Sequence, residues 1–507
     1  MLAKIHTIAL SGVDGIAVEV EVDIANGLPS FSTVGLAEGA VRESKDRVKA
    51  AIKNSGYTFP NRRITVNLAP ADVKKAGTSY DLPMAIGILA AVEPFNQAKL
   101  DSMVLAGELS LDGKLRAIQG ILSMVTAARE QGKKAILVPL ANCQEAAMVR
   151  GIAVYGLTSL DQAVEFLTDR LPLTMAIADH SLAMPAHDDL DFSDVKGQEH
   201  VKRAMEVAAA GGHNILLNGS PGSGKTMIAK RFATILPNLT FEESLETTKI
   251  YSIMGLLAPD QGLVRQRPFR APHHTISDAG LIGGGNQPRP GEVSLAHNGV
   301  LLLDEFPEYK KHVLEVLRQP MEDGSVIISR ASTSLEFPAR FMLVAAMNPC
   351  PCGHLGDHLH NCTCSQAQIK RYKDKLSGPL LDRIDIHLEV PAVPFKEMTK
   401  GREGENSKTI RTRVIAARAL QTRRFKGHKR TYANSQMSSR DLKKYCLLDP
   451  NSLHLLEQGM ERLRLSARAY NRILKIARTI ADLAGLEQIG PGHIAEALQY
   501  RRTDRRT

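Results

Sequence analysis

The chain lacks the features of a disulfide-stapled or membrane-spanning protein. Six cysteines in 507 residues are too few for a disulfide framework, and four of them fall within fifteen positions, which favours a reducing compartment and a candidate metal site. No run of about 18 apolar residues could cross a membrane, and the first twenty residues lack the pattern of a secretory signal. Internal repeats and low-complexity tracts are also absent. We therefore expect a cytoplasmic protein with no membrane partner.

A glycine-rich motif stands near the middle of the chain. It follows Asn214–Asn218, an apolar run typical of a buried strand, and precedes Met227–Leu236, which is apolar at helical spacing. This context supports the template G-x-x-x-x-G-K-[ST], whose backbone N–H groups and lysine hold phosphates and whose last hydroxyl binds Mg²⁺. We expect bound ATP and Mg²⁺. The predicted nucleotide-binding residues are Gly219, Ser220, Pro221, Gly222, Ser223, Gly224, Lys225 and Thr226.

Two further apolar runs end in polar groups that would complete a hydrolytic site. Gly299–Leu303 is followed by Asp304 and Glu305, which we expect to support Mg²⁺ and to orient or deprotonate water, respectively. Phe341–Met347 is followed by Asn348, which is placed to contact the γ-phosphate or the attacking water. Taken alone, each of these polar strand ends is also explained by a strand that reaches solvent. Together with the phosphate loop, they predict a nucleoside triphosphatase.

The net charge of +10 is unevenly distributed. Residues 1–190 hold 18 Lys and Arg against 21 Asp and Glu, residues 191–400 hold 23 against 23, and residues 401–507 hold 23 against 10. A solvated helical face carries such an excess, but so does a surface that binds a phosphate backbone. Beside a triphosphatase core, the basic C-terminal segment favours nucleic acid as a partner.

The hydrophobic patterns divide the chain into four segments. Residues 1–170 mix strand and helix patterns, and residues 171–190 are proline-interrupted and read as a linker. Residues 191–393 alternate strand and helix patterns, which predicts a parallel α/β sheet, and residues 394–507 are helical. Among the N-terminal elements we expect strands at Ala17–Asp23, Arg63–Leu68 and Ala135–Pro139, and helices at Glu38–Ser55 and Asp81–Val92, the latter capped by Asp81. C-terminal helices are expected at Thr409–Thr422, Ser438–Cys446, Asn451–Leu463, Ala467–Leu483 and Gly492–Tyr500.

The order of motifs resembles that of an AAA+ ATPase. The phosphate loop, Asp304-Glu305, Asn348, Leu380–Asp385 and Leu465–Arg468 follow one another as in that family. The runs FRAPHHTIS (269–277), PGEVSLAHNGVLLLDE (290–305), NPCPCG (348–353) and SGPLLDRIDIH (377–387) resemble signatures of its magnesium-chelatase-like branch, specifically the ComM/YifB family. The resemblance covers nearly the whole chain. It implies an AAA+ core with a parallel sheet and a helical lid.

The same resemblance implies two arginine roles and a ring. Arg383 would be an arginine finger that acts across a subunit boundary, and Arg468 would be the sensor-2 arginine of the lid, with Arg472 as a neighbouring alternative. Spreading charge on the transferred phosphoryl group needs such cations beside Lys225. A local ion pair would also explain Arg383, which lies between two aspartates. The implied assembly is a homo-hexamer.

Two inserted segments carry candidate DNA contacts. The polar stretch Arg265–His297, which includes Arg270 and Arg289, corresponds by resemblance to the insert in helix 2 of this AAA+ branch. Gly324–Phe337 is predicted to be a β-hairpin with Arg330 near its turn. In ring translocases of this branch such hairpins point into the pore and grip the nucleic-acid backbone. The alternative is that Arg330 pairs with a neighbouring subunit.

Four cysteines surround a histidine-containing loop. Two close pairs about ten residues apart are typical of a tetrahedral Zn²⁺ site, although C-x-C is tighter than the usual spacing. Free thiols or an unoccupied remnant are the alternatives. The candidate ligands are Cys350, Cys352, Cys362 and Cys364, and the loop holds His354, His358 and His360.

The N-terminal segment resembles the α+β, S5-like proteolytic domain of Lon proteases, through residues 104–140 and 81–87. Lon proteases use a Ser–Lys dyad. By this resemblance the serine position holds Met84 and the lysine position holds Leu122, and neither side chain can act as nucleophile or base. We therefore expect no peptidase activity and a role in assembly or partner binding.

The resemblance to the ComM/YifB family implies an ATP-driven DNA helicase or translocase. Such a protein would promote branch migration of single-stranded or branched DNA in homologous recombination during natural transformation, with recombination proteins as candidate partners. The alternative, implied by the magnesium-chelatase branch, is a chelatase- or chaperone-like ATPase that remodels a protein. The basic C-terminal segment and the predicted hairpin favour the first reading.

Overall fold

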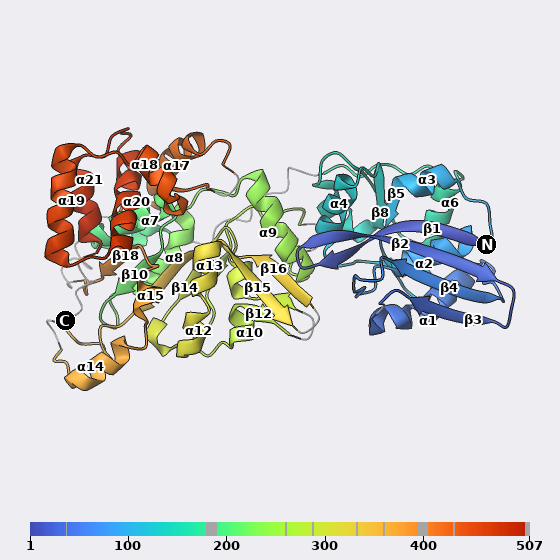
Figure 1. Cartoon of the computed structure of the whole chain (residues 1–507), viewed down its shortest axis with the longest axis horizontal. Helices are drawn as coiled ribbons and strands as arrows, with labels where there is room; N and C mark the ends of the chain where they lie inside the picture. Colours follow the sequence, from blue (N-terminus) through green and yellow to red (C-terminus); the bar gives the residue numbers. More distant parts are fainter. Residues whose placement is uncertain are drawn as a thin grey trace. The chain divides into compact units, whose positions relative to one another are not determined.

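The computed structural model describes residues 1–36, 38–178, 190–258, 261–285, 288–330, 333–357, 360–393, 404–428 and 431–501 (Figure 1). Its contacts divide the chain into two compact units. The first comprises Met1–Met184, Phe241–Arg265 and Ser329–Glu336, and the second comprises Pro185–Thr240, Gln266–Ile328 and Phe337–Thr507. The last two segments of the first unit come from within the range that the sequence assigns to the ATPase core.

The first unit contains two sheets. The larger has the order β1-β2-β4-β3, in which β3 and β4 are parallel and the other pairs antiparallel. Its strands are β1 (Leu2–Ser11), β2 (Asp14–Ala25), β3 (Ser30–Val34) and β4 (Arg63–Ala69). The smaller sheet is parallel, with the order β5-β8-β9, and consists of β5 (Met103–Leu105), β8 (Ala135–Pro139) and β9 (Ala153–Leu157). A short antiparallel pair, β6 (Glu108–Leu109) and β7 (Leu115–Arg116), lies apart from both sheets.

Six helices pack on these sheets because their apolar residues recur at helical spacing. They are α1 (Gly39–Asn54), α2 (Asp81–Ala90), α3 (Gln97–Ser102), α4 (Ile121–Glu130), α5 (Cys143–Ala147) and α6 (Leu160–Leu167). The expectation that Asp81 caps α2 is wrong, since Tyr80 is the N-cap residue. Asp81 is fully buried instead, and it accepts hydrogen bonds from Arg47 Nε (2.9 Å) and the Leu109 backbone N–H (3.2 Å). A buried carboxylate satisfies these long-range donors more effectively than it would its own helix.

A helix that follows the phosphate-loop region in sequence belongs to the first unit. This helix, α9 (Phe241–Ile253), packs against α4, and Leu263 downstream of it lies in the same hydrophobic cluster as α4. The Val264 N–H donates to Thr248 Oγ1 (2.9 Å), and Lys249 pairs with Asp14 (3.8 Å). The segment between the two halves of the ATPase sequence is thus built into the N-terminal fold.

The second unit is organised around a parallel five-stranded sheet in the order β11-β14-β17-β10-β18. Parallel sheets need helices on both faces, and the strands accordingly read as nearly continuous apolar runs. The strands are β10 (Ile215–Asn218), β11 (Phe269–Arg270), β14 (Val300–Leu303), β17 (Met342–Met347) and β18 (Ile386–Glu389). The helices of this core are α7 (Glu199–Gly211), α8 (Lys225–Arg231), α10 (Asp278–Leu281), α11 (Glu292–Leu295), α12 (Lys311–Glu315), α13 (Arg318–Asp323), α14 (Gln366–Lys373) and α15 (Gly378–Leu381). The predicted α/β core is confirmed.

Two β-hairpins and a 3₁₀ turn lie in the same stretch of the sequence, and Ser329–Glu336 of one hairpin belongs to the first unit. The predicted hairpin is present as β15 (Ser325–Arg330) and β16 (Thr333–Pro338), and a shorter one joins β12 (Gly283–Gly284) to β13 (Arg289–Pro290). The 3₁₀ turn η3 (Phe232–Ile235) continues α8, so the expected single helix there is a helix plus a tighter turn.

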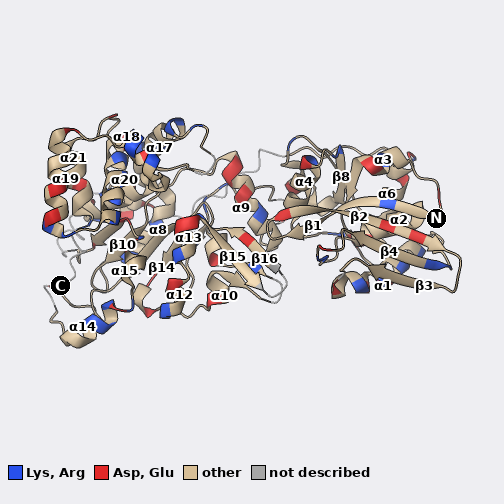
Figure 2. Ribbon diagram, viewed as in Figure 1, with Lys and Arg blue, Asp and Glu red and all other residues tan. Residues whose placement is uncertain are grey.

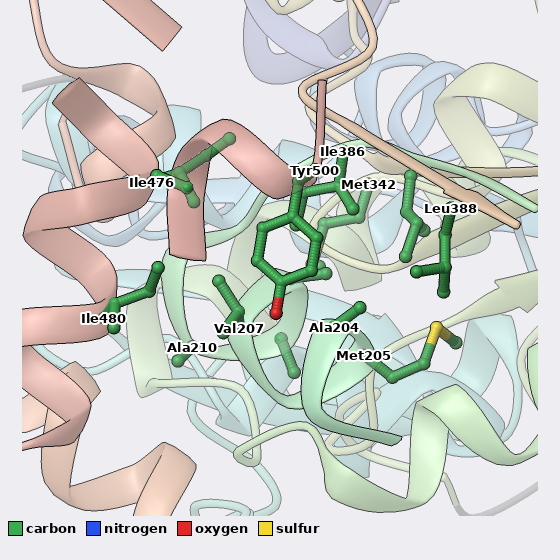
Figure 3. Packing of buried hydrophobic residues seen from close by; sticks show 14 of the residues in the cluster. Ala204, Met205, Val207, Ala210, Met342, Ile386, Leu388, Ile476, Ile480 and Tyr500 are labelled. Atoms are coloured by element: carbon green, nitrogen blue, oxygen red, sulfur yellow. The ribbon is translucent and has the colours of Figure 1, made fainter. Parts of the chain in front are cut away.

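Five C-terminal helices form the lid and share the core of the sheet domain. They are α17 (Ser407–Arg424), α18 (Ser439–Tyr445), α19 (Pro450–Leu463), α20 (Ala467–Leu483) and α21 (Pro491–Gln499). Ile476 and Ile480 of α20 and Tyr500 lie in one hydrophobic cluster with Val207 of α7 and Ile386 of β18 (Figure 3). The His387 N–H also donates to the Tyr500 carbonyl (2.8 Å). The lid is therefore a continuation of the core and not a separate globule.

Part of the expected linker is folded. Residues 171–178 belong to the first unit. The Ala176 N–H donates to the Val154 carbonyl (2.8 Å), and Met175 forms a β-bridge with Tyr155. Residues 179–189 of the expected linker lie outside the described part of the chain. Within that described part, no helix is both long enough and apolar enough to cross a membrane.

Candidate nucleotide site

The phosphate loop connects the carboxyl end of β10 to the first turn of α8. Because β10 lies between β17 and β18, the loop sits beside the ends of two neighbouring strands, where ligands bind in open α/β sheets. Gly222 and Gly224 have φ values of 77° and 87°, which other residues adopt only with strain. Gly219 lies against the backbone of Val390, whose carbonyl oxygen would be 2.2 Å from an added Cβ. These glycines allow the tight path of the loop.

Lys225 bridges the loop and the end of β17. Its Nζ donates to the Gly219 carbonyl (2.7 Å), the Ser220 carbonyl (2.9 Å) and Asn348 Oδ1 (3.1 Å). Desolvation lowers the pKa of Lys225, while the charge of Asp304 opposes that shift. Lys225 and Asn348, which are 123 residues apart, thus meet at one point of the sheet edge.

Thr226 and the acidic pair at the end of β14 form the second half of the site. Thr226 Oγ1 donates to Asp304 Oδ2 (2.6 Å), and the Glu305 N–H donates to Asp304 Oδ1 (2.9 Å). A hydroxyl and a carboxylate at this separation are oxygen ligands of the kind that Mg²⁺ takes. Glu305 adopts a left-handed φ of 52°, and its side chain is 58% exposed. A strained backbone at such a position is common in active sites.

The side chain of Glu305 contacts a histidine from the inserted segment 265–297. His274 Nδ1 lies 3.0 Å from Glu305 Oε2, and its ring packs on that of His273 at 4.1 Å between centroids. The Tyr309 hydroxyl donates to the Pro272 carbonyl (2.6 Å) and fixes the loop that carries both histidines. Sequence reasoning missed this contact, and the only local signal was a histidine pair between β11 and β14.

The two predicted arginines lie in different environments. Arg383 is 8% exposed and pairs with Glu322, while its Nη1 donates to the Pro379 carbonyl (2.5 Å). Arg468 is 70% exposed at the start of α20 and lies 3.8 Å from Asp382. Within the described ranges, the contacts of these two arginines are with these groups and not with the phosphate loop.

Arg472, the alternative to Arg468, has a structural partner. It forms an ion pair with the buried carboxylate of Asp385. The pKa of Asp385 lies below its usual range because Arg472 and a hydrogen bond from His213 outweigh desolvation. His213 Nε2 in turn contacts Thr479 Oγ1 (2.8 Å), so this network joins the lid to the sheet.

The candidate DNA residues differ in their surroundings. Arg270 is held in a two-pronged contact with Glu292, through Nε (2.6 Å) and Nη2 (2.7 Å), which is a structural tie between β11 and α11. Arg289 is exposed on β13. Arg330 ends β15 of the predicted hairpin, and its side chain lies outside the described part of the structure.

Several basic residues of the C-terminal segment form ion pairs within the fold. Arg424 and Arg478 share Asp482, and Arg413 pairs with Glu206 and Glu405. Figure 2 shows blue positions along α17 and beside α18. The exposed basic residues on or next to the lid helices include Arg423, Lys426, Arg440, Lys443, Lys444, Arg462 and Arg464. The exposed basic surface is therefore smaller than the net charge indicates.

The four clustered cysteines converge. The Cys350 Sγ lies 3.4 Å from that of Cys352 and 3.6 Å from that of Cys362, and all four sulfur atoms lie within 4.8 Å of one another. Four thiolates at about 2.3 Å from a tetrahedral Zn²⁺ are about 3.8 Å apart, so the donor set fits this ion. The backbone N–H groups of His354 and Thr363 lower the pKa of Cys352, whereas burial and the neighbouring thiols raise the pKa of Cys362 and Cys364, so the first thiolate forms at Cys352.

The two positions of the first unit that would hold a Ser–Lys dyad are buried and carry nonpolar side chains. Met84 lies in the cluster beneath the larger sheet, and Leu122 lies in the cluster around α4; both are fully buried. The Ser44 hydroxyl contacts the Met84 sulfur at 3.7 Å. Neither side chain can act as nucleophile or base.

Comparison with known proteins gives one consistent set of matches. Residues 191–398 match the family described as magnesium chelatase, subunit ChlI; residues 20–142 match subunit ChlI of Mg-chelatase, and residues 404–501 match the C-terminal part of that subunit. The competence protein ComM of Haemophilus influenzae is 45% identical over 99% of this chain and 97% of its own length. The uncharacterized protein YifB of Escherichia coli is 44% identical over 99% and 98%, respectively. The magnesium-chelatase 38 kDa subunit of Rhodobacter capsulatus is 27% identical over 31% of this chain and 50% of its own length.

Proposed function

The chain belongs to the ComM/YifB family of magnesium-chelatase-like AAA+ proteins, and from that premise we propose that it is an ATP-driven DNA translocase that promotes branch migration in homologous recombination. The observation that carries the ATPase step is the convergence of Lys225, Thr226, Asp304 and Asn348 at one sheet edge. The DNA step is supported by the name of the Haemophilus influenzae relative, a competence protein, and by the exposed basic residues of the lid. Natural transformation is accordingly the proposed setting, inside the cytoplasm.

The residues of the site divide the work of hydrolysis. Lys225 would exchange the carbonyls of Gly219 and Ser220 for β- and γ-phosphate oxygens. Thr226 and Asp304 would hold Mg²⁺, which when bound neutralises charge on the phosphates. Glu305 would orient or deprotonate the attacking water, and Asn348 would position the γ-phosphate or that water.

A ring completes this proposal. Arg383 would stabilise the transition state of a neighbouring subunit after leaving its ion pair with Glu322, and Arg468, exposed at the first turn of α20, would approach nucleotide when the lid closes. The homo-hexamer would place β15 and β16 toward its centre, where Arg330 contacts the DNA backbone. Arg289 is a second exposed candidate, whereas the pairing of Arg270 with Glu292 supports a scaffolding role.

The four cysteines are proposed to hold a structural Zn²⁺. Gly353, which follows Cys352, packs on Pro221, because an added Cβ there would lie 2.5 Å from the proline ring. The cysteine-containing loop therefore buttresses the outer wall of the phosphate loop. Zinc would stiffen this wall without taking part in hydrolysis.

The proposal is tested by ATP hydrolysis and strand exchange on the full chain. We expect single-stranded or four-way-junction DNA to stimulate hydrolysis in a salt-sensitive way, and the wild type to migrate branches while Lys225→Ala and Glu305→Gln do not. Arg330→Ala should lower DNA-stimulated turnover and spare basal turnover, whereas Lys45→Ala, an exposed lysine on α1, should change neither. Hydrolysis without any DNA stimulation or salt-sensitive binding would instead favour remodelling of a protein partner, which the magnesium-chelatase matches suggest.

A further inference from the structure

Next to the four cysteines, three other side chains meet around a single point. Nδ1 of His354 lies 3.3 Å from Asp357 Oδ2, and Nδ1 of His360 lies 3.5 Å from the same oxygen. The two imidazole rings are 4.8 Å apart between centroids, and all three ligand atoms lie within 4.8 Å of one another. Two histidines and one carboxylate thus present two nitrogen donors and one oxygen donor to a common centre.

These separations match the coordination shell of a transition metal. Nitrogen and carboxylate ligands bind Zn²⁺ at about 2.0–2.1 Å, so two ligands of a tetrahedral ion are about 3.3–3.4 Å apart. The measured distances of 3.3 and 3.5 Å lie close to this value. The histidine–carboxylate set suits zinc and its first-row neighbours and not Mg²⁺ or Ca²⁺, which prefer oxygen ligands throughout.

An ordinary ion pair accounts for this arrangement less well. One imidazolium satisfies one carboxylate, whereas here one oxygen faces two ring nitrogens, and two adjacent imidazolium ions would repel each other. The Asp357 side chain is 9% exposed, although His354 and His360 are 32% and 65% exposed. The carboxylate is therefore the least exposed of the three groups, and both ring nitrogens lie near it.

We propose that His354, Asp357 and His360 form a second binding site for a divalent transition-metal ion, separate from the four cysteines. The two donor sets are chemically distinct, since the cysteines supply four sulfurs and close a tetrahedron by themselves. Among the described residues the second set has three ligands, which leaves a fourth coordination position for water or another ligand; His358 of the same loop lies outside the described residues. The inference does not depend on the proposed DNA activity.

The position of this second site gives it a structural consequence. Its ligands lie on the loop between Cys352 and Cys362, whose first residue, Gly353, packs on Pro221 of the phosphate loop. A metal that joins His354 to His360 would shorten the free length of that loop. Occupancy of the second site would therefore order the wall against which nucleotide binds.

Metal content and spectra of the untagged full chain test the proposal. Protein stripped with a chelator is titrated with Co²⁺, and the bound equivalents are counted after gel filtration. We expect two equivalents for the wild type and one fewer for the His354→Ala/His360→Ala variant, which should keep the sulfur-to-cobalt charge-transfer band. Cys362→Ser/Cys364→Ser should lose that band and keep the weaker ligand-field absorption of a nitrogen- and oxygen-ligated ion.

Two further variants make the test independent of folding. Asp357→Asn keeps the shape of the ligand and should weaken Co²⁺ binding at the second site by roughly tenfold or more. His312→Ala is the matched control, because His312 pairs with one aspartate, Asp278, at 3.1 Å and has no place in the site. An unchanged stoichiometry in the double histidine variant, or equal loss in the His312 control, would overturn the proposal.

Discussion

Helices α8 and α4, one in each unit, begin with the same backbone turn and use it differently. Each follows a glycine in the left-handed region, Gly224 with φ 87° before α8 and Gly120 with φ 75° before α4. In α8 the first residues are polar, and Lys225 and Thr226 contact Asn348 and Asp304. A helix N-terminus with free N–H groups and such neighbours is suited to a phosphate ligand.

At the N-terminus of α4, side chains of the protein itself occupy the place that a ligand would take. Ile121 and Leu122 are fully buried, and the Leu122 N–H donates to Glu145 Oε1 (3.2 Å). Glu145 also accepts a hydrogen bond from Ser252 of α9, so an internal carboxyl occupies the position that an external anion would take. The same type of turn thus precedes a candidate ligand site in the second unit and an internal hydrogen-bonded contact in the first.

The largest expected effect comes from removing the polar side chain that makes α8 a ligand site. Lys225→Ala should lower ATP hydrolysis by about a hundredfold or more, because the cation on the phosphates is lost. Nucleotide affinity should fall as well, and thermal unfolding should change little. The measurement is steady-state hydrolysis with nucleotide binding by calorimetry, and an unaffected rate would show that the two N-termini do not differ in function.

The reciprocal change is expected to destabilise the first unit and create no activity. Leu122→Lys would restore the lysine of a Lon-type dyad but bury an unpaired ammonium in the cluster around α4, at a cost of about 3 kcal/mol or more. Leu122→Met is the volume-matched control and should cost less than about 1.5 kcal/mol. Denaturant unfolding and a peptidase assay check both statements. Peptide cleavage by the lysine variant would contradict the view that this N-terminus is closed.

Local sequence patterns were sufficient for much of the second unit. Asp304 and Asn348 each follow an apolar run, and Lys225 follows one through the phosphate loop. Parallel strands bring their carboxyl ends to one edge, so the convergence of these residues could be expected. Regular helices were equally accessible, because α20 spans Ala467–Leu483 as its apolar spacing predicts. These features depend on a few residues at a time.

Contacts between distant segments could not be read in this way. Asp81 has the position of a helix cap, but Arg47 provides a charged partner 34 residues away. Nothing in α9 indicates that it packs on α4, because its apolar residues fit any complementary surface. The approach of His274 to Glu305 likewise depends on a loop path that spacing does not fix. In each of these cases a tertiary partner decided the outcome.

The carboxyl group at the N-terminus of α4 should make the first unit sensitive to pH. Burial raises the pKa of Glu145 from 4.5 to about 7, against hydrogen bonds that lower it. Between these two values the folded state holds a proton that the unfolded state has lost, so stability falls as pH rises from about 4.5 to 7 and stays lowered above it. The difference amounts to about 3 kcal/mol.

Glu145→Gln should remove this dependence. The variant keeps an oxygen that accepts from Leu122 and Ser252 but cannot ionise, so it should equal the wild type near pH 4.5 and exceed it in stability at pH 8. Denaturant unfolding of both proteins across this range, followed by a probe in the first unit, makes the comparison. If the free energy of unfolding changed with pH in the same way for both proteins, the pKa of Glu145 would be the same in the folded and unfolded states.

The smallest expected effects come from a matched pair of hydroxyl groups. Ser252 donates to the buried Glu145, and Thr226 donates to Asp304 at the exposed site (2.6 Å). Ser252→Ala should cost about 1–3 kcal/mol of stability, because a buried carboxyl loses a donor, and should leave basal hydrolysis intact. Thr226→Ala should leave stability nearly unchanged but lower hydrolysis by roughly tenfold at limiting Mg²⁺ and less at saturating Mg²⁺, because one ligand is lost. If each variant changed both stability and hydrolysis, the two helix N-termini would be energetically coupled. The assignment of a structural role to the N-terminus of α4 and a ligand-binding role to that of α8 would then be wrong.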